Sequence, residues 1–365
     1  MLANKNTWIL NLTGLIVSIV TIVALSLQLY LVADFTLLYD FLFTLSYNGQ
    51  NNLRLLGSSL FVALTLALPG LWISNHVKPQ FFYFLVYCFH YTYHHSGNRW
   101  NMSYTLFFEA AWNGILVLLV AVLFSLASAV LIFCASFLFS SQGSPYVFNL
   151  IYTSTGRLFQ LFLTWLLLFI GISVAQNNIK TLHQLRFILI TTMYYLLPIL
   201  VLTSAVVLIL LWHIDLNPNV IITVFFELTI LGILFLNAYY QDGSDELKRM
   251  VWLNWLLRGY KVFLLIMILI ANYYAFRYMS IEPSQLIYLT ISLFVGWLYA
   301  YSAFFSDEKA QKIIENGNKC LVIVFIVAFY LVIASPFNFT VNKDKAPLSL
   351  WHGVDSISKG DAQEH

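Results

Sequence analysis

Apolar residues follow one another in long stretches along this chain, and polar residues gather in the segments between them. Nine stretches are long and apolar enough to cross a hydrocarbon core of about 30 Å as helices. They cover residues 8–33, 55–73, 110–139, 158–175, 187–212, 220–240, 260–278, 286–306 and 320–335. Lipid offers no partner for an unpaired backbone amide, and no alternating strands of a membrane barrel are visible. The pattern predicts an all-α fold, a polytopic transmembrane helical bundle of about nine spans.

Composition supports this class of protein. Hydrophobic residues make up 60% of the chain and charged residues only 9%, whereas soluble domains carry about 25% charged residues. This excludes a cytosolic enzyme and a secreted disulfide scaffold. The formal net charge is +2 and no basic block is present, so we expect no nucleic-acid partner. The expected partner is the lipid bilayer.

The distribution of positive charge predicts the orientation. With nine spans and a cytoplasmic N-terminus, twelve of the 18 Lys and Arg residues face the cytoplasm, as the positive-inside rule requires. The aromatic run 81–95 is interpreted as interfacial. If it crossed the membrane instead, the orientation of every segment before it would be reversed. Residues 1–338 are expected to form one helical transmembrane domain. The polar tail 339–365 is expected to be disordered and extracytoplasmic, together with the C-terminus.

The sixth predicted span contains an acidic residue inside an apolar layer. Thr223, Glu227 and Asn237 share one helical face, and Asn272 of the next span is within reach if the two helices pack as neighbours. An ionised side chain in lipid is expensive and is often functional. These four residues are therefore a candidate polar intramembrane path. The alternative is that Glu227 hydrogen-bonds to neighbouring helices and is purely structural.

The segment 241–258 between the sixth and seventh spans has an amphipathic pattern. Lys248, Arg249 and Arg258 can meet anionic headgroups, while Trp252 and Trp255 anchor at the interface. The pattern predicts a membrane-surface helix on anionic lipids at the cytoplasmic face.

Motifs of known chemistry are scarce. His90 and His94 have a spacing that suits a metal, but no acidic residue accompanies them, so we predict neither a metal nor another cofactor. Asp34 and Asp40 fall in the first predicted outside loop, where lipid-sugar transferases often place an acidic residue. The chain lacks a Gly-x-Ser-x-Gly elbow, a His-Glu-x-x-His pair and a phosphate-binding glycine loop. The motifs that are present and absent therefore argue against an enzyme, and the sequence predicts no catalytic residue.

Residues 109–336 resemble a bacterial membrane protein family, domain of unknown function 4153. The resemblance rests on Glu109-Ala-Ala-Trp112 opening a long helix, on Leu236-Asn-Ala-Tyr-Tyr-Gln-Asp-Gly243, and on a later helix that begins at Arg258 and ends at Arg277. It implies a multi-pass protein of the bacterial inner (cytoplasmic) membrane. It implies no substrate.

Three functional hypotheses remain open. The first is transport or handling of a small solute or lipid through the polar path around Glu227. The second is a non-catalytic scaffold or accessory subunit in cell-envelope biogenesis, recruited by a membrane-protein partner. The third is a transferase that uses Asp34 or Asp40.

Overall fold

The computed structural model describes residues 2–47, 52–68, 80–97, 103–142, 146–152, 156–211, 217–240, 251–281 and 283–334. These residues are built mainly of α-helices, as the apolar pattern predicts. Eight of the described helices are long and apolar enough to cross a membrane. The chain is therefore an all-α, multi-pass membrane protein in contact with the lipid bilayer.

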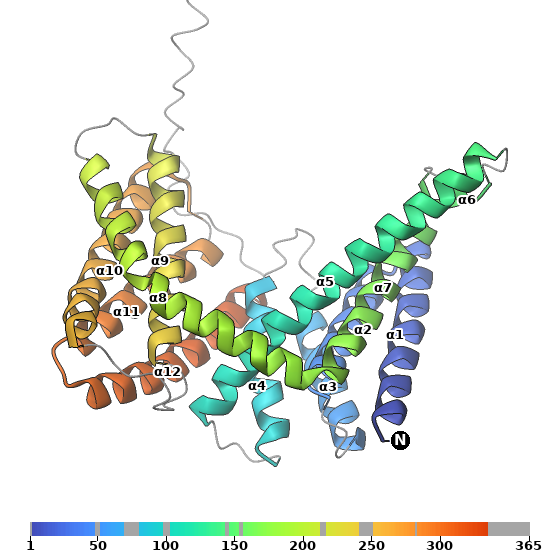
Figure 1. The fold of residues 1–365 in the computed structure, drawn as a ribbon, viewed down its shortest axis with the longest axis horizontal. Helices are drawn as coiled ribbons and strands as arrows, with labels where there is room; N and C mark the ends of the chain where they lie inside the picture. The colour runs from blue at the N-terminus through green and yellow to red at the C-terminus, as the bar shows by residue number, and fades with distance from the viewer. Residues whose placement is uncertain are drawn as a thin grey trace, which may run out of the picture. The chain divides into compact units, whose positions relative to one another are not determined.

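Contacts within the chain define two compact units, Met1–Thr191 and Thr192–His365. Unit 1 contains α1 (Leu2–Ser26), α2 (Tyr30–Leu45), α3 (Asn52–Ala67), α4 (Gln80–His95), α5 (Tyr104–Ser141), α6 (Tyr146–Tyr152) and α7 (Arg157–Asn177) (Figure 1). The helix α8 (Ile179–Leu211) begins in unit 1 and ends in unit 2. Unit 2 continues with α9 (Pro218–Tyr240), α10 (Val251–Tyr278), α11 (Pro283–Ser302) and α12 (Asp307–Ala334). The sequence carries no signal of this division.

The N-terminal region differs from its prediction. The first span ends at Ser26, seven residues earlier than expected, and Gln28 turns the chain with a φ of 59°. The chain then forms α2, which contains Asp34 and Asp40. The prediction that these two residues lie in an outside loop was therefore wrong. The reason is that α2 buries one face, which includes Ala33, Thr36, Asp40 and Thr44. A search for long apolar runs does not detect such a short, partly polar helix.

Two further boundaries differ. Residues 241–250 of the predicted surface helix lie outside the described residues, and the rest of it, from Val251 on, is the first part of α10 rather than a separate helix. The second predicted span, 55–73, is described only as the 16-residue α3.

Close packing holds each unit together. In unit 1, α7 packs against both α1 and α5, and α2 lies between α1 and α3. A Cβ atom on Gly171 of α7 would lie 2.7 Å from the Cα of Ala121 on α5, so only glycine permits this approach. In unit 2, α10 packs between α9 and α11, and α11 packs on α12. Tyr260 and Tyr299 are fully buried in this second unit.

Candidate functional site

The four residues of the predicted polar path lie in different environments of unit 2. Thr223 and Glu227 are exposed on α9. Asn237 is half-buried and accepts hydrogen bonds from the Tyr299 hydroxyl at 2.9 Å and from Asn318 Nδ2 at 3.2 Å.

Asn272 is buried on α10, where its Nδ2 donates to the Ser292 hydroxyl at 3.0 Å. The structure thus brings the two asparagines onto neighbouring helices and leaves Glu227 on the exposed face. A path through all four residues stays a prediction.

The described residues of the predicted surface helix lie at the start of α10. The Trp255 side chain is 72% exposed, and the Arg258 guanidinium lies 5.7 Å from the centre of its ring. Arg258 Nη2 also lies 3.9 Å from the carboxylate of Asp307, which accepts a hydrogen bond from Asn254 at 2.9 Å. Arg258 therefore faces α12 as well as the surface. Lys248, Arg249 and the side chain of Trp252 lie outside the described residues.

The least expected polar residue is Asp40 of unit 1. Its side chain is 0% exposed, and neither carboxylate oxygen has a hydrogen-bond partner among the described residues. Burying an unpaired ionised carboxylate costs several kcal/mol, so such residues are rare and usually functional.

Contacts between α1 and α2 give the depth of Asp40. The hydroxyls of Thr21 and Thr36 hydrogen-bond at 2.9 Å, and Leu10 packs in one apolar cluster with Phe43. The two helices are therefore antiparallel neighbours, as Figure 1 shows. Asp40 is one turn beyond Thr36, about 6 Å along the helix axis. This places Asp40 level with the middle of the span in α1.

Polar groups continue from Asp40 toward the end of α2. The Thr44 hydroxyl donates to the backbone oxygen of Asp40 at 2.6 Å. Gln176 of α7 donates its Nε2 to the backbone oxygens of Thr44 at 3.4 Å and Leu45 at 3.3 Å. Gln176 also lines a cavity of about 20 Å³, which is large enough for a water molecule.

The other polar walls of this cavity come from α4, from α5 and from the second residue after α2. They are Tyr47, Tyr87, Tyr91, His95 and Asn113. Their aromatic rings and amide leave a small polar space inside an otherwise apolar bundle.

A charged network adjoins the cavity. Asn113 donates its Nδ2 to Glu109 Oε1 at 3.3 Å, and its Oδ1 accepts a hydrogen bond from Arg186 Nη1 at 3.4 Å. His183 Nε2 lies 3.9 Å from the same Glu109 oxygen, and the His183 side chain is 41% exposed. Together with the cavity, these residues form a run of polar groups from the backbone of Thr44, one turn after Asp40, to the surface of unit 1.

His90 and His94 form a second cluster, on α4, which is not one of the eight candidate spans. His90 bridges the Ser46 hydroxyl at 2.9 Å and the Ser58 hydroxyl at 3.0 Å, and His94 Nε2 lies 2.7 Å from Ser58 Oγ. Burial and, to a lesser degree, the nearby His94 lower the pKa of His90 to about 3. A neutral His90 therefore links α4 to α3 and to the end of α2. Among the described residues, no group of three or more His, Cys, Asp or Glu could hold a metal ion.

Known proteins give no further guidance, because no family model, curated protein or solved structure matches this chain. The resemblance to domain of unknown function 4153 stays a prediction. Asp40 is noticeable in the sequence, but the apolar pattern predicts a loop at its position. The signal that could have placed it correctly is the spacing of Ala33, Thr36, Asp40 and Thr44, which puts all four on one helical face.

Proposed function

We propose that this multi-pass membrane protein handles or transports a small solute in a proton-linked process, and that unit 1 contains the proton site. The observation that carries the proposal is Asp40, a fully buried carboxyl group at mid-depth without a hydrogen-bond partner among the described residues. Buried acids and histidines are the usual proton carriers of pumps and transporters. In this proposal Asp40 takes up and releases the proton.

The polar groups between Asp40 and the surface support a route for that proton. Gln176 lines the cavity and contacts the backbone of Thr44, one turn after Asp40, and Asn113 lies where the cavity adjoins Glu109. Water in the cavity can connect these groups. Glu109 and the partly exposed His183 would exchange the proton with solvent.

The setting of the protein is part of the same proposal. We place it in a bacterial inner membrane with the N-terminus in the cytoplasm, because the nine spans predicted from the sequence then put twelve of the 18 Lys and Arg residues inside. Lys248, Arg249 and Arg258 would then contact anionic lipids at the cytoplasmic face.

The proposal is tested by pH-jump currents from proteoliposomes that contain the full chain. A buried acid that takes up a proton across part of the bilayer moves charge, so the wild type should give a transient current. Asp40→Asn, which keeps the size of the side chain, should abolish it. Glu227→Gln is the matched control, because it neutralises the exposed acid of unit 2, and it should leave the current unchanged.

Other outcomes contradict the proposal. A current that survives in Asp40→Asn but is lost in Glu227→Gln would favour the path around Glu227. The absence of a wild-type current, together with a co-purifying protein subunit in native mass spectrometry, would favour the scaffold hypothesis. Size-exclusion chromatography checks that each variant stays folded and monodisperse.

A further inference from the structure

We infer that α5, α6 and α7 of unit 1 form a binding site for one acyl chain of an anionic membrane lipid. The site is a groove with a volume of about 350 Å³, within the range of known ligand pockets. It involves none of the residues on the proposed proton route, so the failure of one proposal would leave the other unaffected.

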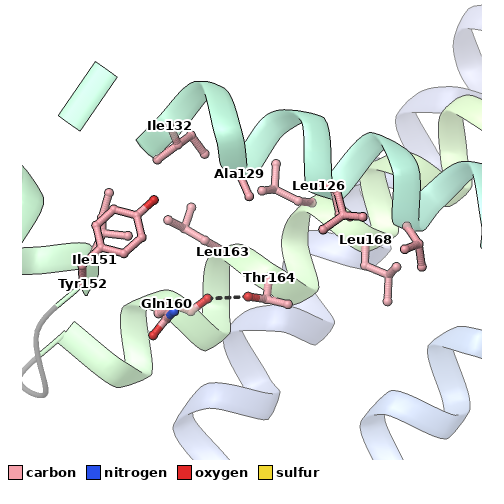
Figure 2. A pocket seen from close by; sticks show the side chains of 12 residues that line it. Leu126, Ala129, Ile132, Ile151, Tyr152, Gln160, Leu163, Thr164 and Leu168 are labelled. Atoms are coloured by element: carbon pink, nitrogen blue, oxygen red, sulfur yellow. Dashed lines mark hydrogen bonds between the residues drawn. The ribbon is translucent and has the colours of Figure 1, made fainter. Parts of the chain in front are cut away.

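The walls of the groove are faces of two membrane-spanning helices. Val122, Leu126, Ala129 and Ile132 recur at helical spacing on α5. Leu163, Thr164, Leu167 and Leu168 form the facing wall on α7, and Ile151 and Tyr152 of α6 close one end (Figure 2). Because both long helices are candidate spans, the groove opens to lipid. An apolar groove in this position suits a hydrocarbon chain.

The length of the groove matches one leaflet. On α7 it extends from Gln160 to Leu168, which is about 12 Å at 1.5 Å per residue. Half of a hydrocarbon core of about 30 Å is about 15 Å. Since α7 begins at Arg157, the groove reaches from the start of this span to near its middle. An acyl chain that enters from the nearer surface fits this distance.

The two ends of the groove differ in polarity. Tyr152 and Gln160 lie at one end, whereas Leu126 and Leu168 lie at the other (Figure 2). Arg157 is exposed one turn before Gln160 and is the only charged residue between Glu109 and Lys180. No ion pair joins Arg157 to an acidic residue in the described part of the chain. A positive charge beside the polar end favours an anionic headgroup.

The test is native mass spectrometry of the full chain released from nanodiscs of equal phosphatidylglycerol and phosphatidylcholine. The wild type should retain one lipid, with phosphatidylglycerol preferred. Ala129→Phe fills the groove and should lower retention about tenfold. Val130→Phe is the matched control, because the next residue of α5 points away from this face, and it should retain lipid like the wild type.

The variant Arg157→Gln tests recognition of the headgroup separately from binding of the acyl chain. It should keep the retained lipid but lower the preference for phosphatidylglycerol about fivefold, as expected for the loss of about 1 kcal/mol from one cation near the surface. Retention in Ala129→Phe equal to that of the wild type would overturn the site, and so would a wild type without retained lipid. Equal retention of both lipids by the wild type would overturn the anionic headgroup.

Discussion

The two units bury different kinds of polar residue. The interior of unit 1 contains the carboxyl group of Asp40 and the imidazole of His90. The interior of unit 2 contains hydroxyl groups, tyrosines and the amide of Asn272, and both Asn272 and Tyr299 hydrogen-bond between helices. A charged residue is buried there too, since Lys261 is 1% exposed, but it donates to the Tyr240 hydroxyl.

The difference shows that burial, not position in an apolar run, distinguishes the two acids. Glu227 lies inside a long apolar run but on an exposed face of α9, whereas Asp40 lies in a short helix and is enclosed. Amide networks tie helices together without changing charge. An enclosed acid without a partner can exchange a proton, and we therefore assign the proton-linked role to unit 1.

The largest expected effect concerns the packing that encloses unit 1. In Gly171→Ala the new Cβ would overlap backbone atoms of Ala121, so α5 and α7 must separate. Overpacking of this kind costs about 3 kcal/mol. In unit 2, Gly317→Ala meets only the side chain of Leu298, which can move, so we expect a smaller loss of about 1 kcal/mol. Thermal unfolding in detergent measures both.

Gly259→Ala is the control for this comparison, because nothing lies within 4 Å of its added Cβ. It should not lower the melting temperature, since alanine favours a helix over glycine by about 1 kcal/mol. An equal loss in Gly171→Ala and Gly317→Ala would show that the two units are packed equally tightly.

The next effect is the response of unit 1 to acid. The pKa of His90 is about 3 in the folded protein and about 6.5 in the unfolded chain. Below pH 6.5 the unfolded chain binds a proton that the folded protein excludes. Stability should therefore fall as the pH drops from about 6.5 toward 3, by up to about 1.4 kcal/mol per pH unit.

His90→Asn should weaken this dependence, as measured by melting temperatures between pH 7.5 and about 5, and the rest should persist because burial also lowers the pKa values of His94 and His95. The matched control is His183→Asn, because the side chain of His183 is partly exposed. This variant should keep the acid dependence of the wild type. A wild type with no loss of stability in this range would contradict a buried, neutral His90.

A smaller effect is expected for the amide network of unit 2. Asn237→Ala removes the acceptor of both the Tyr299 hydroxyl and the Asn318 amide. Hydrogen bonds between membrane helices contribute about 1 kcal/mol, so the melting temperature should fall modestly and independently of pH. A pH-dependent loss would mean that an ionisable group is coupled to this network.

The smallest effect is expected for Glu227→Gln. Glutamine keeps the size of the Glu227 side chain, which has no hydrogen-bond or ion-pair partner among the described residues, so this change should alter stability by less than about 0.5 kcal/mol. Its melting temperature should equal that of the wild type. A clear stabilisation or destabilisation would show that Glu227 is packed against another group, and would weaken the contrast between the units.

The sequence predicts the fold class well because eight helices are defined by long apolar runs alone. It does not predict α2 as a helix, since α2 is short and carries two acids. The candidate site is harder to predict from the sequence than the fold. Glu227 was conspicuous because its neighbours are apolar, yet only the structure shows that its face is exposed. Asp40 becomes a candidate proton site only when α1 and α3 are packed against α2, and no local pattern gives that arrangement.

Infrared titration of the carboxyl band in lipid nanodiscs tests the central claim most directly. Asp40 is expected to exchange its proton, so the wild type should show a protonated carboxyl band that changes with pH and shifts in deuterium oxide. Asp40→Asn should lack that component, and Glu227→Gln should keep it. Identical pH-dependent spectra for the wild type and Asp40→Asn would contradict the assignment of the proton site to unit 1.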